Sequence, residues 1–421
     1  MSEDCDTPSH MCSLPTELLL NIYSYLPAID LIKFRLVCSR WKTIIDSFTG
    51  NNELWVRFSR IDFPAIYRRS RLKTSSTVSW FDFYKSLYLW RKLSEAWEEA
   101  DEFASAAGVM QEIRSFEIVQ EDMIGVLSKS AITYYDTNTL EKSARGAISG
   151  SYSRYKENCN AIVISSYALH LFIIRKSHST FPMELNRTFD NVKLFTLTED
   201  AVYFVTLSDE IYVSELQRDD GLLKQTYMNH SEDGVMALGF SNGHLNILTF
   251  NRTIYTMVNK QMVFACALGQ DCNLFYQLQK YNLLDQMDWR VYIQWMHVFR
   301  HTVPDGLFLD LIIVRQYGDV FFVGSNWGVL RIYYAPSFGM DIDLFSMEPI
   351  KQYNFMERVD CPVLSTCPII GVDVVEIKDG HRVFVAMPKK IAVLTFTHSF
   401  KRNVNLAILP YDEVQRVKLL K

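Results

Sequence analysis

Residues 201–214 read AVYFVTLSDEIYVS, and the pattern in this stretch recurs over most of the chain. Two runs of β-branched and aromatic residues, AVYFVT and IYVS, flank the turn LSDE. Runs of this length and composition, joined by a short polar turn, are typical of two neighbouring strands in a hairpin. The stretch therefore predicts one strand pair.

The same unit recurs along the chain. The other occurrences begin at residues 123, 161, 234, 273, 319 and 382 and read MIGVLSKSAITYY, AIVISSYALHLFII, GVMALGFSNGHLNILTF, NLFYQLQKYNLL, DVFFVGSNWGVLRIYY and RVFVAMPKKIAVLTF. Successive turns are roughly 35 to 45 residues apart, with a longer last interval, which is the repeat length of propeller blades. Seven units predict a seven-bladed β-propeller, in which each small sheet packs against its neighbours. The Trp-Asp and Gly-His signatures of the commonest propeller repeat are absent, so a pair of β-sandwiches or another β-rich body is the alternative.

The composition is that of a large folded protein. The chain has 421 residues, a length typical of two or three domains, and 48% of them are hydrophobic. Aromatic residues make up 14%, which favours a β-rich body over a coiled coil. The net charge of −5 excludes a chain-wide basic field, so neither nucleic acid nor a membrane surface is an expected partner.

The first residues and the cysteines indicate an intracellular protein. The opening MSEDCDTPSH is acidic and polar, and no uninterrupted apolar run of 18 residues follows it. The eight cysteines are scattered without a disulfide-like spacing, which is typical of reduced thiols. We therefore expect a cytoplasmic and/or nuclear location.

The first hundred residues have helical rather than strand periodicity. Residues 13–27 read SLPTELLLNIYSYLP, in which Pro15 suits a first helical turn. One broad apolar face follows at steps of three and four, made of Leu18, Leu19, Ile22, Tyr25 and Leu26. This stretch predicts an amphipathic helix that ends at Pro27.

Further helices are expected after this one. Asp30 and Ser39 are predicted N-caps of a second and a third helix. A fourth helix is expected over residues 52–59, and a longer one from about residue 79 to residue 103, where tryptophans and other apolar residues recur at helical spacing. The acidic end of the longer segment, EAWEEADEF, is unfavourable at a helix C-terminus.

The residues of these helices resemble the F-box motif, whose pattern is Leu-Pro-x-Glu, an apolar helix, a Leu before a short loop, Asp-Leu, and then Val-Cys-x-x-Trp. The matching residues are Leu14-Pro15, Glu17-Leu18, Ile22, Leu26, Asp30-Leu31, Arg35, Val37-Cys38, Arg40-Trp41 and Ile44. The segment with Leu54-Trp55, Arg57 and Asp62-Phe63 also looks like the one that commonly follows an F-box. The resemblance spans residues 13 to about 50.

This resemblance implies a function. F-box proteins are substrate receptors of Skp–cullin–F-box (SCF) ubiquitin ligases, in which the F-box docks on a Skp-type adaptor and through it on cullin and RING subunits. The remaining domain holds the protein to be ubiquitinated. The positions that match the adaptor contact or its supporting core are Leu14, Pro15, Leu18, Ile22, Leu26, Leu31, Val37 and Trp41.

The physical properties of the segment agree with a docking role. A three-helix unit of about 40 residues is too small to bury all of its apolar surface, and a dense apolar remainder is typical of an interface. The alternative is that these helices pack only against the Trp-rich helix behind them. Trp41 and Cys38 fit either interpretation, whereas Leu14 and Pro15 have little core to join.

No catalytic residue, metal or cofactor is predicted. The patterns CxxC, GxxxxGK[ST], GxSxG and HExxH are all absent. The pairs that remain are Cys266 with Cys272, Cys361 with Cys367, and His297 with His301. The cysteine pairs are spaced more widely than zinc-ligand pairs, and the histidines lie in a segment that alternates like a strand.

The run from Arg68 to Lys73 is the only concentrated basic stretch. We interpret it as a solvated loop between the F-box and the long helix; a nuclear import signal and a phosphate-binding patch are the alternatives. The residues that would contact a substrate are unknown from the sequence.

Together these patterns predict an α+β multidomain chain. The expected parts are a disordered N-terminus over residues 1–12, an F-box over 13–60, a helical linker over 61–108 and a β-propeller-like substrate-binding domain over 109–421. The expected function is that of a non-catalytic receptor subunit, which acts by proximity. The alternatives are a catalytic or ligand-binding β domain regulated by the helices, and an F-box scaffold that does not deliver targets for degradation.

Overall fold

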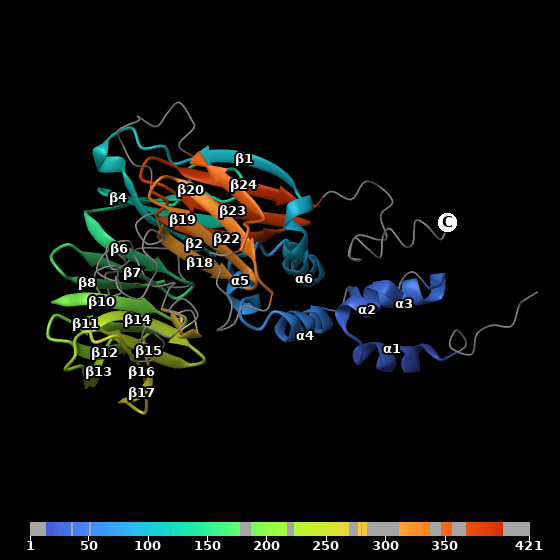
Figure 1. The fold of residues 1–421 in the computed structure, drawn as a ribbon, viewed down its shortest axis with the longest axis horizontal. Helices are drawn as coiled ribbons and strands as arrows, with labels where there is room; N and C mark the ends of the chain where they lie inside the picture. The colour runs from blue at the N-terminus through green and yellow to red at the C-terminus, as the bar shows by residue number, and fades with distance from the viewer. Residues whose placement is uncertain are drawn as a thin grey trace, which may run out of the picture. The chain divides into compact units, whose positions relative to one another are not determined.

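The structure of the chain is a computed structural model (Figure 1). It describes residues 14–34, 37–49, 52–120, 122–176, 187–216, 223–268, 277–278, 280–283, 311–336, 347–355 and 368–398. The predicted disordered segment over residues 1–12 lies outside this part. The chain forms two compact units. The helical unit comprises Met1–Glu98, Glu376–His381 and Phe396–Lys421, and the sheet unit comprises Glu99–Val375 and Arg382–Thr395.

The helical unit contains short helices, most of them near the predicted places. They are α1 (Thr16–Ser24), α2 (Ala28–Phe34), α3 (Ser39–Thr49), α4 (Asn52–Asp62), α5 (Tyr67–Lys73), α6 (Trp80–Leu89) and the 3₁₀ segment η2 (Trp90–Glu95). Asp30 lies in the first turn of α2 rather than at its N-cap, where its negative charge still favours the helix. Ser79 caps α6 by accepting a hydrogen bond from the Asp82 amide at 3.0 Å.

The prediction of one long helix over residues 79–103 is wrong after Leu89, where the α-helix ends and the 3₁₀ segment η2 follows with non-helical backbone at Lys92. The chain leaves η2 and continues as strand β1 (Trp97–Phe103), which pairs with β24 (Ile391–Thr397). Four acids near a helix C-terminus would oppose its dipole, whereas an outer strand exposes them to water. The helical linker expected over residues 61–108 therefore ends before β1.

The basic run is a helix and not a loop. Residues 68–73 lie within α5, and the Arg71 guanidinium stacks over the rings of Trp80 and Phe83 at 4.8 and 5.6 Å. The same group donates a hydrogen bond to the Val78 carbonyl at 2.7 Å. Arg71 thus fixes the turn between α5 and α6.

A buried polar cluster joins α6 and η2 to the segment Glu376–His381 within the helical unit. The Glu376 carboxylate accepts hydrogen bonds from the Trp90 indole at 2.8 Å and from the Ser86 hydroxyl, and lies 2.7 Å from Nδ1 of His381. The His381 ring stacks on Trp90 with centroids 3.8 Å apart, and Lys85 pairs with Asp379. Since Glu376 is fully buried, these bonds compensate its desolvation.

The sheet unit contains six four-stranded sheets in the described part of the chain. The first sheet contains β2 (Ile113–Val119), β3 (Met123–Ser128), β4 (Ala131–Asp136) and β5 (Ile148–Ser149). The second contains β6 (Tyr152–Glu157), β7 (Ala161–Ser166), β8 (Leu171–Arg175) and β9 (Arg187–Phe189). The third contains β10 (Val192–Leu197), β11 (Ala201–Thr206), β12 (Glu210–Glu215) and β13 (Gln225–His230). The fourth contains β14 (Val235–Ser241), β15 (His244–Thr249), β16 (Thr253–Val258) and β17 (Gln261–Ala267). The fifth contains β18 (Leu311–Tyr317), β19 (Val320–Ser325), β20 (Val329–Tyr334) and β21 (Lys351–Asn354). The last has the order β1-β24-β23-β22, with β22 (Gly371–Ile377) and β23 (Gly380–Ala386).

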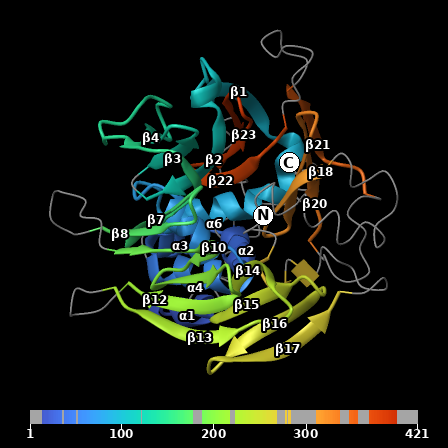
Figure 2. The same ribbon diagram turned by 90° about the vertical axis from the view of Figure 1, so that its left-hand side faces the viewer.

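These sheets form a β-propeller, as predicted. Figure 2 shows them following one another around a ring, each built from strands consecutive in sequence except the last. The first strands β2, β6, β10 and β14 contact one another in that order. In the last sheet, β1 comes from the beginning of the sheet unit and the other three strands from its end, so the ring is closed by two distant segments of chain.

The same irregularity recurs at the start of the first strands. In β2, β6, β10, β14 and β18, one extra residue is inserted opposite the second strand, at Arg114, Ser153, Lys193, Met236 and Ile312. Such a β-bulge increases local twist and redirects a side chain. Its repetition at equivalent positions marks the sheets as copies of one structural unit.

Six of the seven predicted strand pairs are confirmed as β3–β4, β7–β8, β11–β12, β14–β15, β19–β20 and β23–β24. The seventh, which begins at residue 273, lies largely outside the described residues. Seven blades therefore stay a prediction.

Buried His398 of the helical unit predicts a dependence of the unit's stability on pH. Burial, followed by the neighbouring His381 ring, lowers the pKa of His398 from 6.5 to about 3, with Lys92 and Lys85 acting in the same direction and Glu376 opposing. The folded state therefore binds fewer protons than the unfolded state between pH 6.5 and pH 3, and stability falls as the pH falls through that window. From pH 8 to pH 5 the loss expected from this group is about 2 kcal/mol.

Hydrogen exchange of α6 amides as a function of pH, corrected for intrinsic rates, measures this loss. His398→Asn is expected to remove most of the pH dependence, whereas His244→Asn, at an exposed position on β15, is expected to leave it unchanged. Equal pH profiles for wild type and His398→Asn would contradict the assignment.

Candidate functional site

Helix α1 has apolar side chains on two different faces. Leu19 and Tyr23, four residues apart, are buried in the core, with Leu19 0% exposed. Leu18 and Ile22 have the same spacing but point away from it, and Leu18 is 49% exposed. Tyr25, directly after the helix, continues the outward stripe and is 80% exposed. We call Leu18, Ile22 and Tyr25 the α1 stripe.

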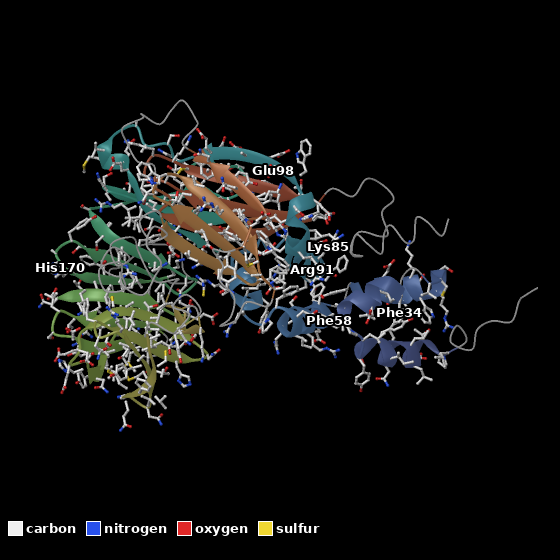
Figure 3. All side chains as sticks on the ribbon, in the orientation of Figure 1. Phe34, Phe58, Lys85, Arg91, Glu98 and His170 are labelled. Atoms are coloured by element: carbon white, nitrogen blue, oxygen red, sulfur yellow. The ribbon has the colours of Figure 1, made fainter. Side chains whose placement is uncertain are left out.

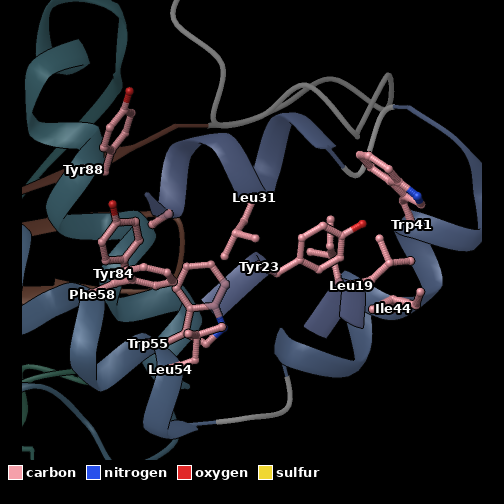
Figure 4. Close-up of a cluster of buried hydrophobic side chains, with 12 residues drawn as sticks. Leu19, Tyr23, Leu31, Trp41, Ile44, Leu54, Trp55, Phe58, Tyr84 and Tyr88 are labelled. Carbon is pink, nitrogen blue, oxygen red and sulfur yellow. The ribbon is translucent and has the colours of Figure 1, made fainter. Parts of the chain in front are cut away.

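The inward face of α1 is fixed by aromatic packing (Figure 4). The Tyr23 ring meets Trp41 of α3 edge-on with centroids 5.7 Å apart, and the Phe34 ring meets Trp41 edge-on at 5.4 Å. Edge-to-face aromatic pairs have a preferred geometry and contribute beyond the area that they bury. Rotation of α1 about its axis would break these contacts, so the α1 stripe stays on the outside.

The same core continues into α4 and α6. The Trp55 ring lies 4.8 Å from Phe81 and 5.4 Å from Tyr84, and all three belong to or pack against the cluster that contains Tyr23. The Tyr84 hydroxyl donates a hydrogen bond to Asp62 at 2.7 Å. Burial and the Asp62 carboxylate raise the pKa of Tyr84 far above its usual value, so this phenol remains a donor.

Arginines hold both ends of α1. The Arg40 guanidinium of α3 donates to the Leu14 carbonyl at 2.6 Å, just before the helix. The Arg57 guanidinium of α4 donates to the Ser24 carbonyl at the last turn, where a cation also favours the helix dipole. Because the backbone is fixed at both ends, the α1 stripe is presented in one conformation, which lowers the entropy cost of binding.

The structure separates the eight predicted site residues by exposure. Pro15, Leu18, Ile22 and Val37 are exposed, Leu14 and Leu26 are half-buried against the core, and Leu31 and Trp41 are buried within it. The first four have surface available to a partner, and the other four support them. The assignment of the eight residues to an adaptor contact stays a prediction.

Tyr25 was not among the predicted site residues, although it is the most exposed large apolar residue of the described chain. The available signal was its position three residues after Ile22. Around it the helix is almost uncharged, because Glu17 is the only Asp, Glu, Lys or Arg in TELLLNIYS. The surface that α1 presents therefore suits an apolar partner rather than a charged one.

Neither a metal site nor a membrane-spanning helix is found in the described residues. No group of three or more His, Cys, Asp or Glu side chains could hold a metal ion there. Of the predicted thiols, Cys266 lies on β17 with its Sγ 3.7 Å from Oε1 of Gln277. Cys272, Cys361 and Cys367 lie outside the described residues, as do His297 and His301. No helix in the described ranges is both long and apolar enough to cross a membrane.

Comparison with known proteins identifies the helical segment. Residues 11–51 match the profile of the F-box domain, which includes α1, α2 and α3. No curated protein matches the chain by sequence.

Several solved structures are similar to this chain at low identity. Hsv2 of Kluyvelomyces marxianus is 13% identical, with 69% of this chain and 74% of that chain covered and a TM-score of 0.31. BamB of Moraxella catarrhalis is 11% identical, with coverages of 66% and 82% and a TM-score of 0.37. The N-terminal domain of Nup159 is 10% identical, with coverages of 68% and 76% and a TM-score of 0.36. These similarities are too low for a functional inference, and the propeller assignment depends on the sheet topology described above. The chain thus carries an F-box domain followed by a β-propeller.

Leu18 and Leu19 form a matched pair that tests the two faces of α1. Leu19→Ala is expected to destabilise the helical unit by about 2–5 kcal/mol, because it leaves a cavity in the aromatic core. Leu18→Ala is expected to change stability by less than about 0.5 kcal/mol, because its side chain is largely in water. Urea denaturation followed by hydrogen exchange at α3 compares the two, and equal losses would contradict the orientation of α1.

Proposed function

We propose that the chain is the substrate-recognition subunit of an SCF-type ubiquitin ligase. The F-box domain supports an SCF substrate-receptor role in general, and binding to a Skp-type adaptor is the general property of such domains. The observation that supports this proposal most strongly is the α1 stripe. It is apolar, outward-facing and rigidly held, and it lies within the matched segment.

The free energy gained by burying the α1 stripe is of the size expected for part of a docking site. Complete burial of a Leu or Ile side chain contributes roughly 1.5–3 kcal/mol, so covering the exposed halves of Leu18 and Ile22 contributes roughly half of that for each. Tyr25 adds an aromatic anchor with a polar tip, the kind of side chain enriched at interface centres. Association itself costs several kcal/mol, so the adaptor must also cover neighbouring surface such as the exposed Val37.

In this proposal the chain acts by proximity and supplies no catalytic group. The adaptor links the F-box to cullin and RING subunits, while the propeller binds a protein substrate for ubiquitination and proteasomal degradation. Holding the substrate beside the conjugating enzyme raises its effective concentration, which needs no acid, base or nucleophile from this chain. We place this activity in the cytoplasm and/or nucleus.

Reversal of the polarity of the stripe tests the adaptor contact. Leu18→Asp combined with Ile22→Asp is expected to weaken capture of a purified Skp-type adaptor by the full chain at least about a hundredfold, because the interface would bury two unpaired charges. Leu72→Asp, at an exposed apolar position on α5, is the matched control and is expected to bind like wild type.

Circular dichroism and urea denaturation confirm that each variant is folded before the comparison. Adaptor capture by the double variant at wild-type affinity would refute the proposed role of the stripe. Failure of the wild-type chain to bind any Skp-type adaptor would refute the ligase assignment itself.

A further inference from the structure

Large apolar side chains are exposed at one repeated position of the propeller. Tyr167 follows β7, Leu207 follows β11 and Phe250 follows β15, so each is the first residue after the second strand of its sheet. They are 43%, 54% and 46% exposed. We call these three residues the turn patch. Exposed apolar groups at equivalent turns of three neighbouring sheets are more than isolated surface residues.

Backbone hydrogen bonds show that the three turns lie side by side at one end of the sheets. The Leu207 amide donates to the Asn191 carbonyl at 2.8 Å, and the Val192 amide donates to the Leu169 carbonyl at 2.8 Å, which joins the turn after β7 to the turn after β11. The Ser231 amide donates to the Asp209 carbonyl at 3.1 Å, so the turn after β11 contacts the segment that leads into β14.

Phe250, the residue after β15, contacts that same segment. The Phe250 amide donates to the Gly234 carbonyl at 3.2 Å, and its ring lies so close to Gly234 that an added Cβ there would be 3.0 Å from it. The Val235 amide donates to the Asp209 carboxylate at 2.5 Å. The turn patch is therefore held by backbone hydrogen bonds from neighbouring strands, which is the rigidity that a binding site requires.

Acidic side chains surround the apolar ones. Glu232 and Asp233 are exposed immediately before Gly234, and no ion pair is found for either within the described residues. Asp190 is next to Asn191, and its carboxylate lies 2.7 Å from Nδ1 of His170, a residue labelled in Figure 3.

Two cations close to the patch are engaged by the protein. Lys193 pairs with Asp209, and the Arg114 guanidinium lies over the Tyr167 ring at 5.0 Å. Exposed carboxylates at Asp190, Glu232 and Asp233 therefore contribute negative charge to the rim beside Leu207 and Phe250, where Arg252 contributes one positive charge. Complementary charge across an interface determines which partner is accepted.

We infer that the turn patch binds a protein segment in which large apolar side chains are flanked by Lys or Arg. This inference rests on the proposed function, because it names the class of substrate that the receptor would present. Apolar side chains of the segment would cover Leu207 and Phe250, and its cations would face Asp190, Glu232 and Asp233. An acidic or phosphorylated segment would be repelled by the same rim.

Three labelled peptides of equal length and equal Leu and Phe content test the inference, one flanked by Lys and Arg, one by Glu and Asp, and one by Ser and Asn. Fluorescence anisotropy with the full chain bound to its adaptor is expected to rank the basic peptide first. Leu207→Glu with Phe250→Glu is expected to weaken its binding by about tenfold or more. Phe264→Glu, on the outer strand β17, is the matched control and is expected to bind like wild type.

Charge reversal gives a second test that does not alter the apolar residues. Glu232→Lys with Asp233→Lys is expected to reverse the preference from the basic to the acidic peptide. Absence of binding by all three peptides, equal binding of the basic and acidic peptides, or no effect of the Leu207 and Phe250 substitutions would overturn the inference. A chain that dimerises until Leu207 and Phe250 are replaced would also overturn it, in favour of a second copy as occupant.

Adaptor capture is measured in parallel with each variant. We expect it to be unchanged, because the F-box surface is not altered. Loss of adaptor binding in the wild-type chain would refute the proposed function, whereas loss of peptide binding alone would refute only this inference.

Discussion

The edge-to-face contact between Tyr23 and Trp41 fixes the orientation of α1, on which the proposed docking surface depends. Helix α1 is apolar on more than one side, so composition alone leaves two orientations open. Once Tyr23 packs on Trp41 and Leu19 enters the same core, Leu18, Ile22 and Tyr25 have no place inside. The segment is too small to cover them with its own residues, and a partner is the remaining way to remove them from water.

The core that holds α1 continues through Trp55 to Tyr84 on α6, and α6 is in turn held by the buried Glu376. A carboxylate without solvent is costly unless its oxygens are hydrogen-bonded, and Trp90, Ser86 and His381 provide those bonds. The F-box helices are thus one end of a continuously packed helical unit. This rigidity suits a receptor, because a docking surface that keeps its conformation loses less entropy when it binds.

Most of the fold could be predicted from the sequence, because most strands pair with a strand that is adjacent in sequence. Strand pairs such as 201–214 consist of two adjacent apolar runs and a turn, and six of them are present where the pattern places them. Strand β1 was missed because its partner β24 is almost 300 residues away and its residues WEEADEF are exposed, so neither a hairpin nor an apolar alternation signals it. The α5 helix was missed because its ordering depends on Arg71 stacking against Trp80, a contact that spacing does not reveal.

The candidate site was also only partly predictable, because its geometry depends on contacts between segments distant in sequence. The motif located the F-box segment and eight candidate residues between Leu14 and Trp41, but Leu18 and Leu19 are neighbours of one type, and only tertiary packing distinguishes the exposed one from the buried one. The turn patch could not be predicted either, since Tyr167, Leu207 and Phe250 are about 40 residues apart and become neighbours only when the sheets assemble.

The central claim is that the outward face of α1 is where this chain meets a Skp-type adaptor. Hydrogen exchange of the full chain, with and without a saturating purified adaptor, tests it most directly. We predict added protection in α1 and in the segment from Val37 to Trp41, with unchanged exchange in β7, β11 and β15. Unchanged exchange in α1 together with new protection in the sheets would contradict the account.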